Sequence, residues 1–204
     1  MKLMHGKVSP FARKVVIAAI EKGLDSELEL IPTAVGQGKI NRDLMQLNPT
    51  GKIPTLVADD GTPLYDSLVI IDYFDELRPE PRLIPPSGAE RRRALRLNAI
   101  GDGLLIAGVL AKTESARPQE RQWPEMVEAQ WAKVVNCLDA LEQELGNGAN
   151  GLSVGEIAAG CALGWMDVRA PEEAWRSQRP GLASWFSGFG ERPSMLRTAP
   201  VAPK

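Results

Sequence analysis

The sequence is poor in the residues that metal and redox sites most often use. Its 204 residues include two cysteines and one histidine. Cys137 and Cys161 lack the Cys-x-x-Cys spacing, and one pair of cysteines does not make a disulfide framework. His5 alone cannot supply a histidine-based metal cluster within one chain. We therefore predict no metal site, and we interpret Cys161 as a packing residue of the core.

The chain also lacks an excess of positive charge and long hydrophobic runs. It has 24 Lys and Arg against 26 Asp and Glu, so its net charge of −2 gives no reason to expect binding to nucleic acid or to an anionic membrane. No run reaches the roughly 18 apolar residues of a membrane span, and the N-terminus has no signal-peptide core. Hydrophobic residues make up 44% of the chain and charged residues 25%, as in soluble globular proteins. We expect a cytoplasmic protein.

The first clear element is a helix that begins after Ser9. Serine at the N-cap followed by Pro10 at the first helical position is a strong start signal. Apolar residues at helical spacing predict a helix over residues 11–22, which ends at Gly23. Its charged residues are expected to face water; they are Arg13, Lys14, Glu21 and Lys22.

Short strands surround this helix in the first 78 residues. We predict strands over 1–4, 27–31, 55–58 and 63–65, a short helix over 43–47, and a helix capped by Asp66 or Ser67. Asp60-Gly61 marks a hairpin between the last two strands. A parallel start followed by an antiparallel hairpin predicts a mixed sheet covered by helices.

A proline-rich linker over 79–88 separates this unit from a helical one. Helices are predicted over 89–116, 125–145 and 182–189, with the tail from Pro193 docked as coil. Ser153 and Glu156 form a capping box at the start of another helix. Ile157, Cys161 and Trp165 share one face of that helix, which predicts a buried position. The predicted domains are 1–78 and 89–204.

The stretch from Asn48 to Leu56 places Pro54 at the mouth of a strand. A proline there removes a donor of the strand ladder, so it belongs to an edge or a shaped turn. A cis Ile53–Pro54 bond would present the Ile53 backbone N–H and C=O as an unpaired edge that a short peptide could join. The alternative is an ordinary trans proline in a loop, and this stretch alone does not exclude it.

Together, Ser9-Pro10-Phe11, the Asn48 to Pro54 stretch, Asp66-Ser67 and the Ser153 capping box resemble the bacterial glutathione S-transferases, in a serine-type, uncharacterised subgroup. The resemblance covers nearly the whole chain. It implies an α/β thioredoxin-like N-terminal domain, an all-α C-terminal domain, a cis-proline at Pro54, and a homodimer.

The resemblance also implies a glutathione site. The Ile53 main chain, beside Pro54, corresponds to the contact with the cysteinyl unit. Asp66 would meet the ammonium of the γ-glutamyl end, while Ser67 and the helix N-terminal amides would meet its carboxylate.

Three further residues have a weaker correspondence to this site. Lys39 and Lys52 are candidates for the glycine carboxylate. Asp102 is a candidate second contact to the ammonium across the dimer, with a polar contact between helices as the alternative. Glutathione would then be a co-substrate and not a bound cofactor.

The chemistry of Ser9 can be argued from magnitudes. A free thiol has a pKa of about 8.5, and lowering it by about two units takes roughly 2.7 kcal/mol. A hydrogen bond to a charged group contributes about 1.5–3 kcal/mol, and the helix N-terminus adds to it. Ser9 can therefore be catalytic without a general base; the alternative is a plain N-cap worth about 1 kcal/mol.

The function expected from these residues is a detoxifying glutathione transferase that acts on a small apolar electrophile. Serine cannot form a mixed disulfide, which favours conjugation, or peroxide and disulfide reduction with two glutathiones, over exchange through an enzyme thiol. The alternative is a non-catalytic regulatory protein similar to the stringent starvation proteins, which bind RNA polymerase. Several residues are left with two interpretations. His5 has a surface or packing role, or a catalytic one. The run Arg91, Arg92 and Arg93 forms a solvated helix face or subunit contact, or binds an anionic ligand. Core packing or the lining of an apolar pocket for the electrophile remains open for Ile106, Val109 and Leu110.

Overall fold

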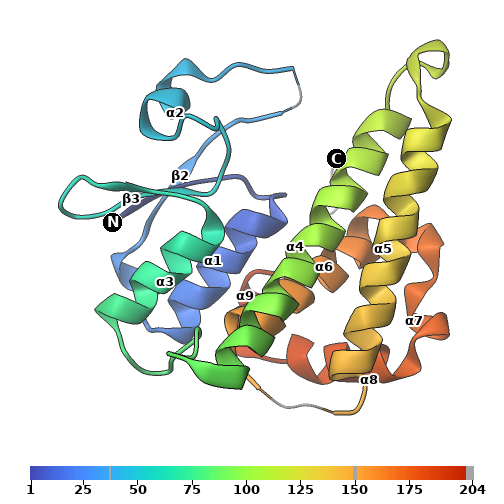
Figure 1. The fold of residues 1–204 in the computed structure, drawn as a ribbon. Helices are drawn as coiled ribbons and strands as arrows, with labels where there is room; N and C mark the ends of the chain where they lie inside the picture. Colours follow the sequence, from blue (N-terminus) through green and yellow to red (C-terminus); the bar gives the residue numbers. More distant parts are fainter. Residues whose placement is uncertain (37, 149–150, 201–204) are drawn as a thin grey trace.

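The computed structural model describes residues 1–36, 38–148 and 151–200 (Figure 1). An N-terminal mixed sheet with its helices lies beside a helical C-terminal half. This arrangement confirms the predicted fold class, a thioredoxin-like domain followed by an all-α domain.

The N-terminal sheet has the strand order β2-β1-β3-β4. Its strands are β1 (Lys2–His5), β2 (Glu29–Pro32), β3 (Thr55–Val57) and β4 (Pro63–Leu64). β1 pairs parallel with β2 and antiparallel with β3, which pairs antiparallel with β4. Helices α1 (Pro10–Glu21) and α3 (Ser67–Leu77) lie on one side of the sheet, and α2 (Arg42–Leu47) lies on the other (Figure 1).

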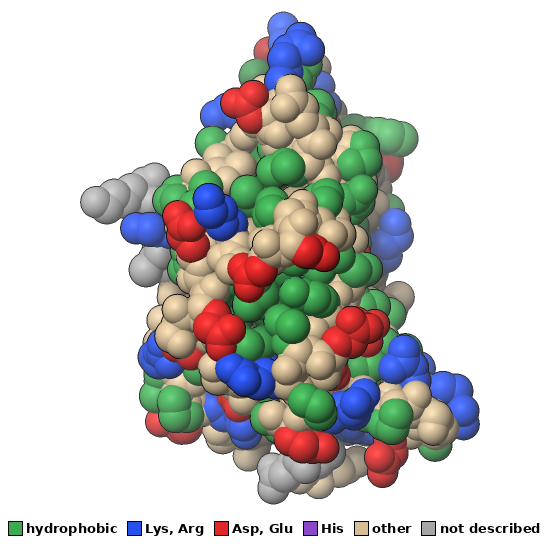
Figure 2. All heavy atoms as spheres, turned by 90° about the vertical axis from the view of Figure 1, so that its left-hand side faces the viewer, with side chains coloured by type: hydrophobic (Ala, Val, Ile, Leu, Met, Phe, Trp, Pro, Cys, Tyr) green, Lys and Arg blue, Asp and Glu red, His purple; other side chains and the backbone are tan. Residues whose placement is uncertain are grey.

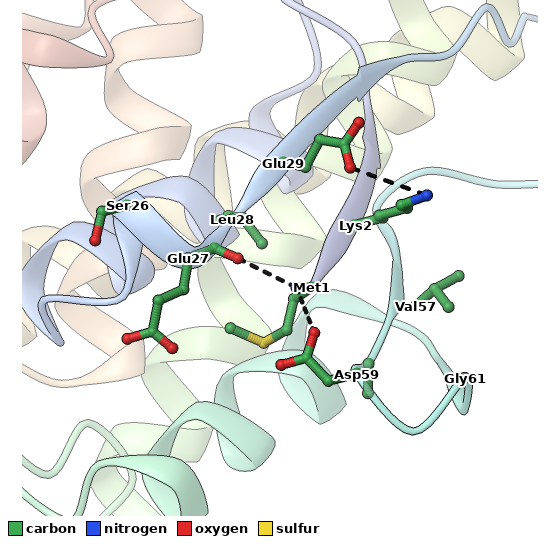
Figure 3. A pocket seen from close by; sticks show the side chains of 10 residues that line it. Met1, Lys2, Ser26, Glu27, Leu28, Glu29, Val57, Asp59 and Gly61 are labelled. Carbon is green, nitrogen blue, oxygen red and sulfur yellow. Dashed lines mark hydrogen bonds and ion pairs between the residues drawn. The ribbon is translucent and has the colours of Figure 1, made fainter.

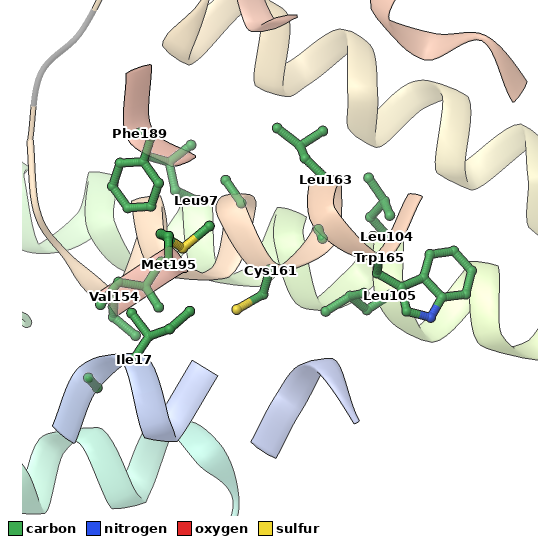
Figure 4. Close-up of a cluster of buried hydrophobic side chains, with 14 of the residues drawn as sticks. Ile17, Leu97, Leu104, Leu105, Val154, Cys161, Leu163, Trp165, Phe189 and Met195 are labelled. Atoms are coloured by element: carbon green, nitrogen blue, oxygen red, sulfur yellow. The ribbon is translucent and has the colours of Figure 1, made fainter. Parts of the chain in front are cut away.

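The C-terminal half is built around α6 (Val154–Arg169), whose residues from Val154 to Met166 are all buried. The long helices α4 (Gly88–Ser115) and α5 (Pro124–Leu145) pack against each other, and α4 also packs along α6. Cys161 is fully buried in this core, as predicted, and Figure 4 shows it between α6 and α1. The described part of the chain ends with three further α-helices: α7 (Trp175–Gln178), α8 (Pro180–Gly190) and α9 (Pro193–Arg197).

The cap of α6 uses side chains from two helices. Ser153 Oγ accepts a hydrogen bond from the Gly155 amide at 3.1 Å and donates one to the Glu156 carboxylate. Arg93 Nη1 donates to the same carboxylate at 2.7 Å. Arg93 is therefore a structural partner of a buried acid, and its Nη2 is buried without a hydrogen-bond partner among the described residues.

The expectation that all charged residues of α1 face water was wrong. The Lys14 side chain is fully buried, and its Nζ lies 2.7 Å from Asp102 of α4. Lys22 is buried too, with Nζ 2.6 Å from Asp75 of α3 and 2.8 Å from the Pro81 carbonyl oxygen. Both lysines lie where a second element covers α1, and each brings its positive charge to a carboxylate of that element.

The tail was also predicted incorrectly, because it contains α9 and not only coil. Arg192, at the start of α9, donates to both carboxylate oxygens of Glu21 on α1 at 3.0 Å. Ser194 Oγ donates to the same carboxylate at 2.5 Å. These contacts dock the short helix against α1.

The α4 helix bears on the expectation that the chain has no membrane span. It contains an 18-residue window that is long and apolar enough to cross a membrane by length and composition. Half of that window is buried inside the fold, and the core helix of a soluble protein passes the same test. It is weak evidence for a membrane span.

Candidate active site

The sheet register brings three separate sequence segments to one edge. Met4 pairs with Thr55, so the end of β1 lies beside the start of β3. β4 runs antiparallel to β3, so its end points toward the same edge. The loop after β1, the loop before β3 and the segment after β4 therefore meet there. These three segments contain Ser9, Ile53-Pro54 and Asp66-Ser67.

Ser9 is the N-cap of α1. Its Oγ accepts a hydrogen bond from the Ala12 amide at 3.2 Å, and its own amide donates to the Gly6 carbonyl oxygen at 2.9 Å. Because the hydroxyl acts as acceptor in the cap, its proton is left to donate to another group. The half-buried side chain thus combines a structural role with a donor at the positive end of a helix.

The Ile53–Pro54 peptide bond is cis in the structure. A methyl group added at Gly6 would lie 2.9 Å from Ile53 Cδ1, so the Ile53 side chain packs against the loop that leads to Ser9. A side chain at position 6 would require the end of the Ile53 side chain to move.

Asn48 organises the loop before β3, a role that the sequence analysis missed. Its Nδ2 donates to the Lys52 carbonyl oxygen at 3.0 Å and to Thr55 Oγ1 at 2.9 Å, while its Oδ1 accepts from the Thr50 amide at 2.9 Å. The side chain is buried. The Asn-Pro turn is a sequence signal that could have indicated this role.

Asp66 and Ser67 stand at the start of α3. Asp66 is its N-cap, with Oδ1 accepting from the Leu68 amide at 3.0 Å, and its side chain is exposed. The Tyr65–Asp66 peptide bond is cis. Ser67 is buried in the first turn of the helix. A carboxylate and a hydroxyl are thus held at a helix N-terminus, where the free amides attract anions.

The remaining candidates differ in their surroundings. Lys39 and Lys52 are exposed, and neither has an ion pair within the described ranges. Asp102 accepts from Lys14 Nζ and from Asn98 Nδ2, so in this chain it belongs to the contact between α1 and α4. His5 lies in β1; burial first, and then the charge of Lys7, lower the pKa of its imidazole.

A small pocket lies between the two halves of the molecule, directly beside Ser9. It is lined by Lys7, Val8, Ser9, Pro10 and Arg13 from the first domain, and by Cys161, Trp165, Val168, Arg169 and Pro200 from the second. Burial raises the pKa of the Cys161 thiol to about 11, so Cys161 is not a reactive thiolate. Ile106 of α4 is exposed, and the described lining of this pocket contains no residue of α4.

A larger open depression, of about 520 Å³, lies at the opposite end of β1 (Figure 3). The Met1 ammonium pairs there with Asp59 Oδ1 at 2.7 Å and donates to the Glu27 carbonyl oxygen at 3.2 Å. Because β1 runs away from Met1 toward His5, this depression is separated from Ser9 by the length of the strand. No group of His, Cys, Asp or Glu that could hold a metal occurs within the described residues.

Comparisons with known proteins agree with this geometry. The family model "Glutathione S-transferase, N-terminal domain" matches residues 8–77, and "Glutathione S-transferase, C-terminal domain" matches residues 122–188. The chain is 32% identical to the uncharacterized GST-like protein YibF of Escherichia coli (strain K12) over 98% of both chains.

Solved structures give the same result. A glutathione transferase family member from Pseudomonas fluorescens Pf-5, with bound glutathione, superposes with a TM-score of 0.94 at 37% identity over 98% of this chain and 99% of that chain. A glutathione S-transferase from Methylobacillus flagellatus KT, with glutathione bound, gives a TM-score of 0.88 at 34% identity over 98% and 99% of the two chains. The chain therefore belongs to the glutathione S-transferase family.

Proposed function

We propose that this protein is a glutathione transferase that binds glutathione along the sheet edge and stabilises its thiolate with the Ser9 hydroxyl. The observation that carries the proposal is the placement of Ser9, Ile53-Pro54 and Asp66-Ser67 at one edge of the sheet. The relatives from P. fluorescens and M. flagellatus, which contain bound glutathione, support it.

Each part of glutathione has a proposed partner. The Ile53 main chain, beside Pro54, pairs with the cysteinyl unit, and Asp66 with the ammonium of the γ-glutamyl end. Ser67 and the amides of α3 meet the γ-glutamyl carboxylate. Lys39 and Lys52 are free to reach the glycine carboxylate. We assign Asp102 to the domain contact, because Lys14 and Asn98 already occupy its carboxylate.

Conjugation is the reaction that this site supports best. Serine cannot form a mixed disulfide, and burial raises the pKa of both cysteine thiols. The P. fluorescens relative has also been solved with S-(propanoic acid)-glutathione, so the site of that relative accepts a substituent on the sulfur. Reduction of a peroxide or disulfide by two successive glutathiones is the second reaction we consider.

The cellular setting is proposed from the family. We expect a cytoplasmic detoxification enzyme without a metal and without nucleic-acid or membrane partners. We place the division between its two domains at residues 79–88.

We also expect the protein to work as a homodimer. Hydrophobic side chains gather between charged ones on the face shown in Figure 2, and α3 exposes Val69 and Leu77. Light scattering of the purified protein measures the assembly directly.

The role of Ser9 is tested by Ser9→Ala with the pH dependence of thiolate absorbance of bound glutathione. Loss of one hydrogen bond to a charged sulfur, about 1.5–3 kcal/mol, should raise the thiol pKa by about one to two units. Asn41→Ala is the matched control, because Asn41 Oδ1 caps α2 through the Leu44 amide at 3.0 Å. An unchanged thiol pKa with full activity in Ser9→Ala would show that Ser9 is only a helix cap.

A non-catalytic binding protein is the second candidate function. Its support is the similarity to the stringent starvation protein A homolog of Pasteurella multocida, 37% identity over 123 residues, or 59% of this chain and 54% of that one. Binding of glutathione at millimolar concentration distinguishes the two candidate functions. It is measured by titration calorimetry or by elution of the protein from immobilised glutathione. Absence of binding would exclude the transferase and favour this candidate.

A further inference from the structure

The pocket beside Ser9 is lined by cations. Lys7, Arg13 and Arg169 contribute to its wall, and no Asp or Glu is among the described residues that line it. Within residues 1–36, 38–148 and 151–200, none of the three has an acidic side chain within ion-pair distance. This contrasts with Lys14, Lys22, Arg93 and Arg192, which each reach a carboxylate.

Arg13 carries the strongest signal, because part of its guanidinium is buried and unsatisfied. Its Nε donates to Thr198 Oγ1 and its Nη2 to the Met195 carbonyl oxygen, both at 3.3 Å. Its Nη1 is buried without any hydrogen-bond partner in the structure. A buried donor of this kind is costly unless an acceptor is supplied, and an anion is the acceptor that suits it best.

The second domain makes room for this guanidinium. A methyl group added at Gly164 of α6 would lie only 2.6 Å from Arg13 Nη1. Arg13 therefore reaches from α1 across the domain contact to the same helix that provides Arg169. Two helices that are distant in sequence thus each contribute an arginine to the wall of one small pocket.

The size of this space limits the ligand. Its free volume is about 20 Å³, roughly what one water molecule requires. A group the size of one carboxylate oxygen matches this space. Ser9, which we place beside the glutathione sulfur, lies in the same wall, so the anionic group would be held a short distance from the reacting atoms.

We propose that the second substrate is a small electrophile that carries a carboxylate, such as an α,β-unsaturated acid, with the carboxylate bound by Lys7, Arg13 and Arg169. This inference rests on the proposed function and replaces the apolar electrophile expected from the sequence. The glutathione sulfur forms a bond to the β-carbon, and the π electron pair moves to the α-carbon. The α-carbon takes a proton from water, and the carboxylate is unchanged.

Binding of two isosteric product analogues tests the inference without turnover. S-(2-carboxyethyl)glutathione carries the carboxylate, and S-(2-carbamoylethyl)glutathione replaces it with a neutral amide. By calorimetry we expect the carboxylate analogue to bind at least about tenfold more tightly than the amide analogue. A charge-assisted hydrogen bond contributes a free energy that corresponds to a tenfold or larger change in affinity. In Arg169→Gln and Lys7→Gln the preference should fall several-fold, while the exposed Lys133→Gln should retain it. Arg13 is not substituted, because its side chain also donates hydrogen bonds to Thr198 and to the Met195 carbonyl oxygen in the C-terminal segment.

Three outcomes are distinguishable. A carboxylate preference that is lost in the two pocket variants supports the inference. Tight binding of glutathione with equal affinity for both analogues, or a preference that the pocket variants do not change, overturns the inference and leaves the transferase proposal intact. Failure of glutathione and of both analogues to bind overturns the proposed function, and the inference with it.

Turnover with acrylate and acrylamide provides the second readout. The ratio of kcat/KM for acrylate to that for acrylamide should fall by about tenfold in Arg169→Gln relative to the unmodified protein. The ratio cancels any general loss of activity. A ratio that stays the same in both pocket variants contradicts the proposed role of the cations.

Discussion

The ion pair between Lys14 and Asp102 links the two domains, and its removal should have an asymmetric cost. The Lys14 side chain is fully buried, whereas the Asp102 side chain is 21% exposed. Lys14 Nζ donates to both Asp102 oxygens at 2.7 Å and to Asn98 Oδ1 at 2.9 Å. Breaking a buried pair costs about 3–5 kcal/mol because a charge is left without its partner.

The structure indicates which variant lies at which end of that range. In Lys14→Met, the Asp102 carboxylate keeps the Asn98 Nδ2 donor at 3.0 Å and reaches solvent, so we expect a loss of about 3 kcal/mol. In Asp102→Ala, the buried ammonium keeps only Asn98 Oδ1, so we expect about 5 kcal/mol. The double variant leaves no unpaired charge, and its cost should fall at least about 2 kcal/mol below the sum.

Urea unfolding measures these free energies. All five tryptophans lie in the C-terminal half, so fluorescence reports on that domain, and circular dichroism should follow both domains. Lys2→Met is the control, because the Lys2–Glu29 pair is exposed and 4.0 Å apart; its cost should stay below about 1 kcal/mol. The reasoning is refuted if Asp102→Ala costs no more than Lys14→Met. A loss of glutathione affinity in Asp102→Asn that Lys14→Met does not share would identify Asp102 as a ligand.

Two further predictions concern stability. Gly155→Ala should destabilise the protein by about 1–3 kcal/mol or more, because its Cβ would lie 2.5 Å from Leu97 Cβ and 2.7 Å from the Ala94 carbonyl oxygen. As a control, Gly188→Ala should stabilise the protein by about 0.5–1 kcal/mol, because nothing lies within 4 Å of the added methyl group. Equal effects of the two substitutions on thermal unfolding would contradict the packing of α4 on α6. Burial alone would raise the pKa of the Glu21 carboxyl, but hydrogen bonds from Arg192 and Ser194 outweigh it and lower this pKa below its usual 4.5. The stabilisation by Glu21 is therefore complete above about pH 4.5 and is lost as the pH falls through the folded-state pKa. At about pH 6, Glu21→Gln should therefore be less stable than the unmodified protein, and this difference in unfolding free energy should shrink as the pH is lowered toward about 3. For the exposed control Glu76→Gln the difference should stay constant over this range. A constant difference for Glu21→Gln as well would contradict the assignment.

Local sequence signals determined the helix caps, the order of the secondary-structure elements and the burial of Cys161. Ser9 before Pro10 and Asp66 before α3 cap their helices as the sequence indicates, because a cap depends on residues within one turn. The order of strands and helices follows from hydrophobic periodicity for the same reason. The burial of Cys161 follows from the apolar face that it shares with Ile157 and Trp165.

Other features were decided only by the tertiary structure. Periodicity treats a charged residue as exposed, but Lys14 and Lys22 are buried because a neighbouring helix covers each of them and supplies a carboxylate. The cationic pocket joins Arg13 with Arg169, more than 150 residues apart in the chain. Nothing local to either residue indicates the other, because their proximity comes from the packing of α1 against α6. The sequence thus determined the family and the three segments that we propose bind glutathione, while the packing of the two domains created the pocket beside Ser9.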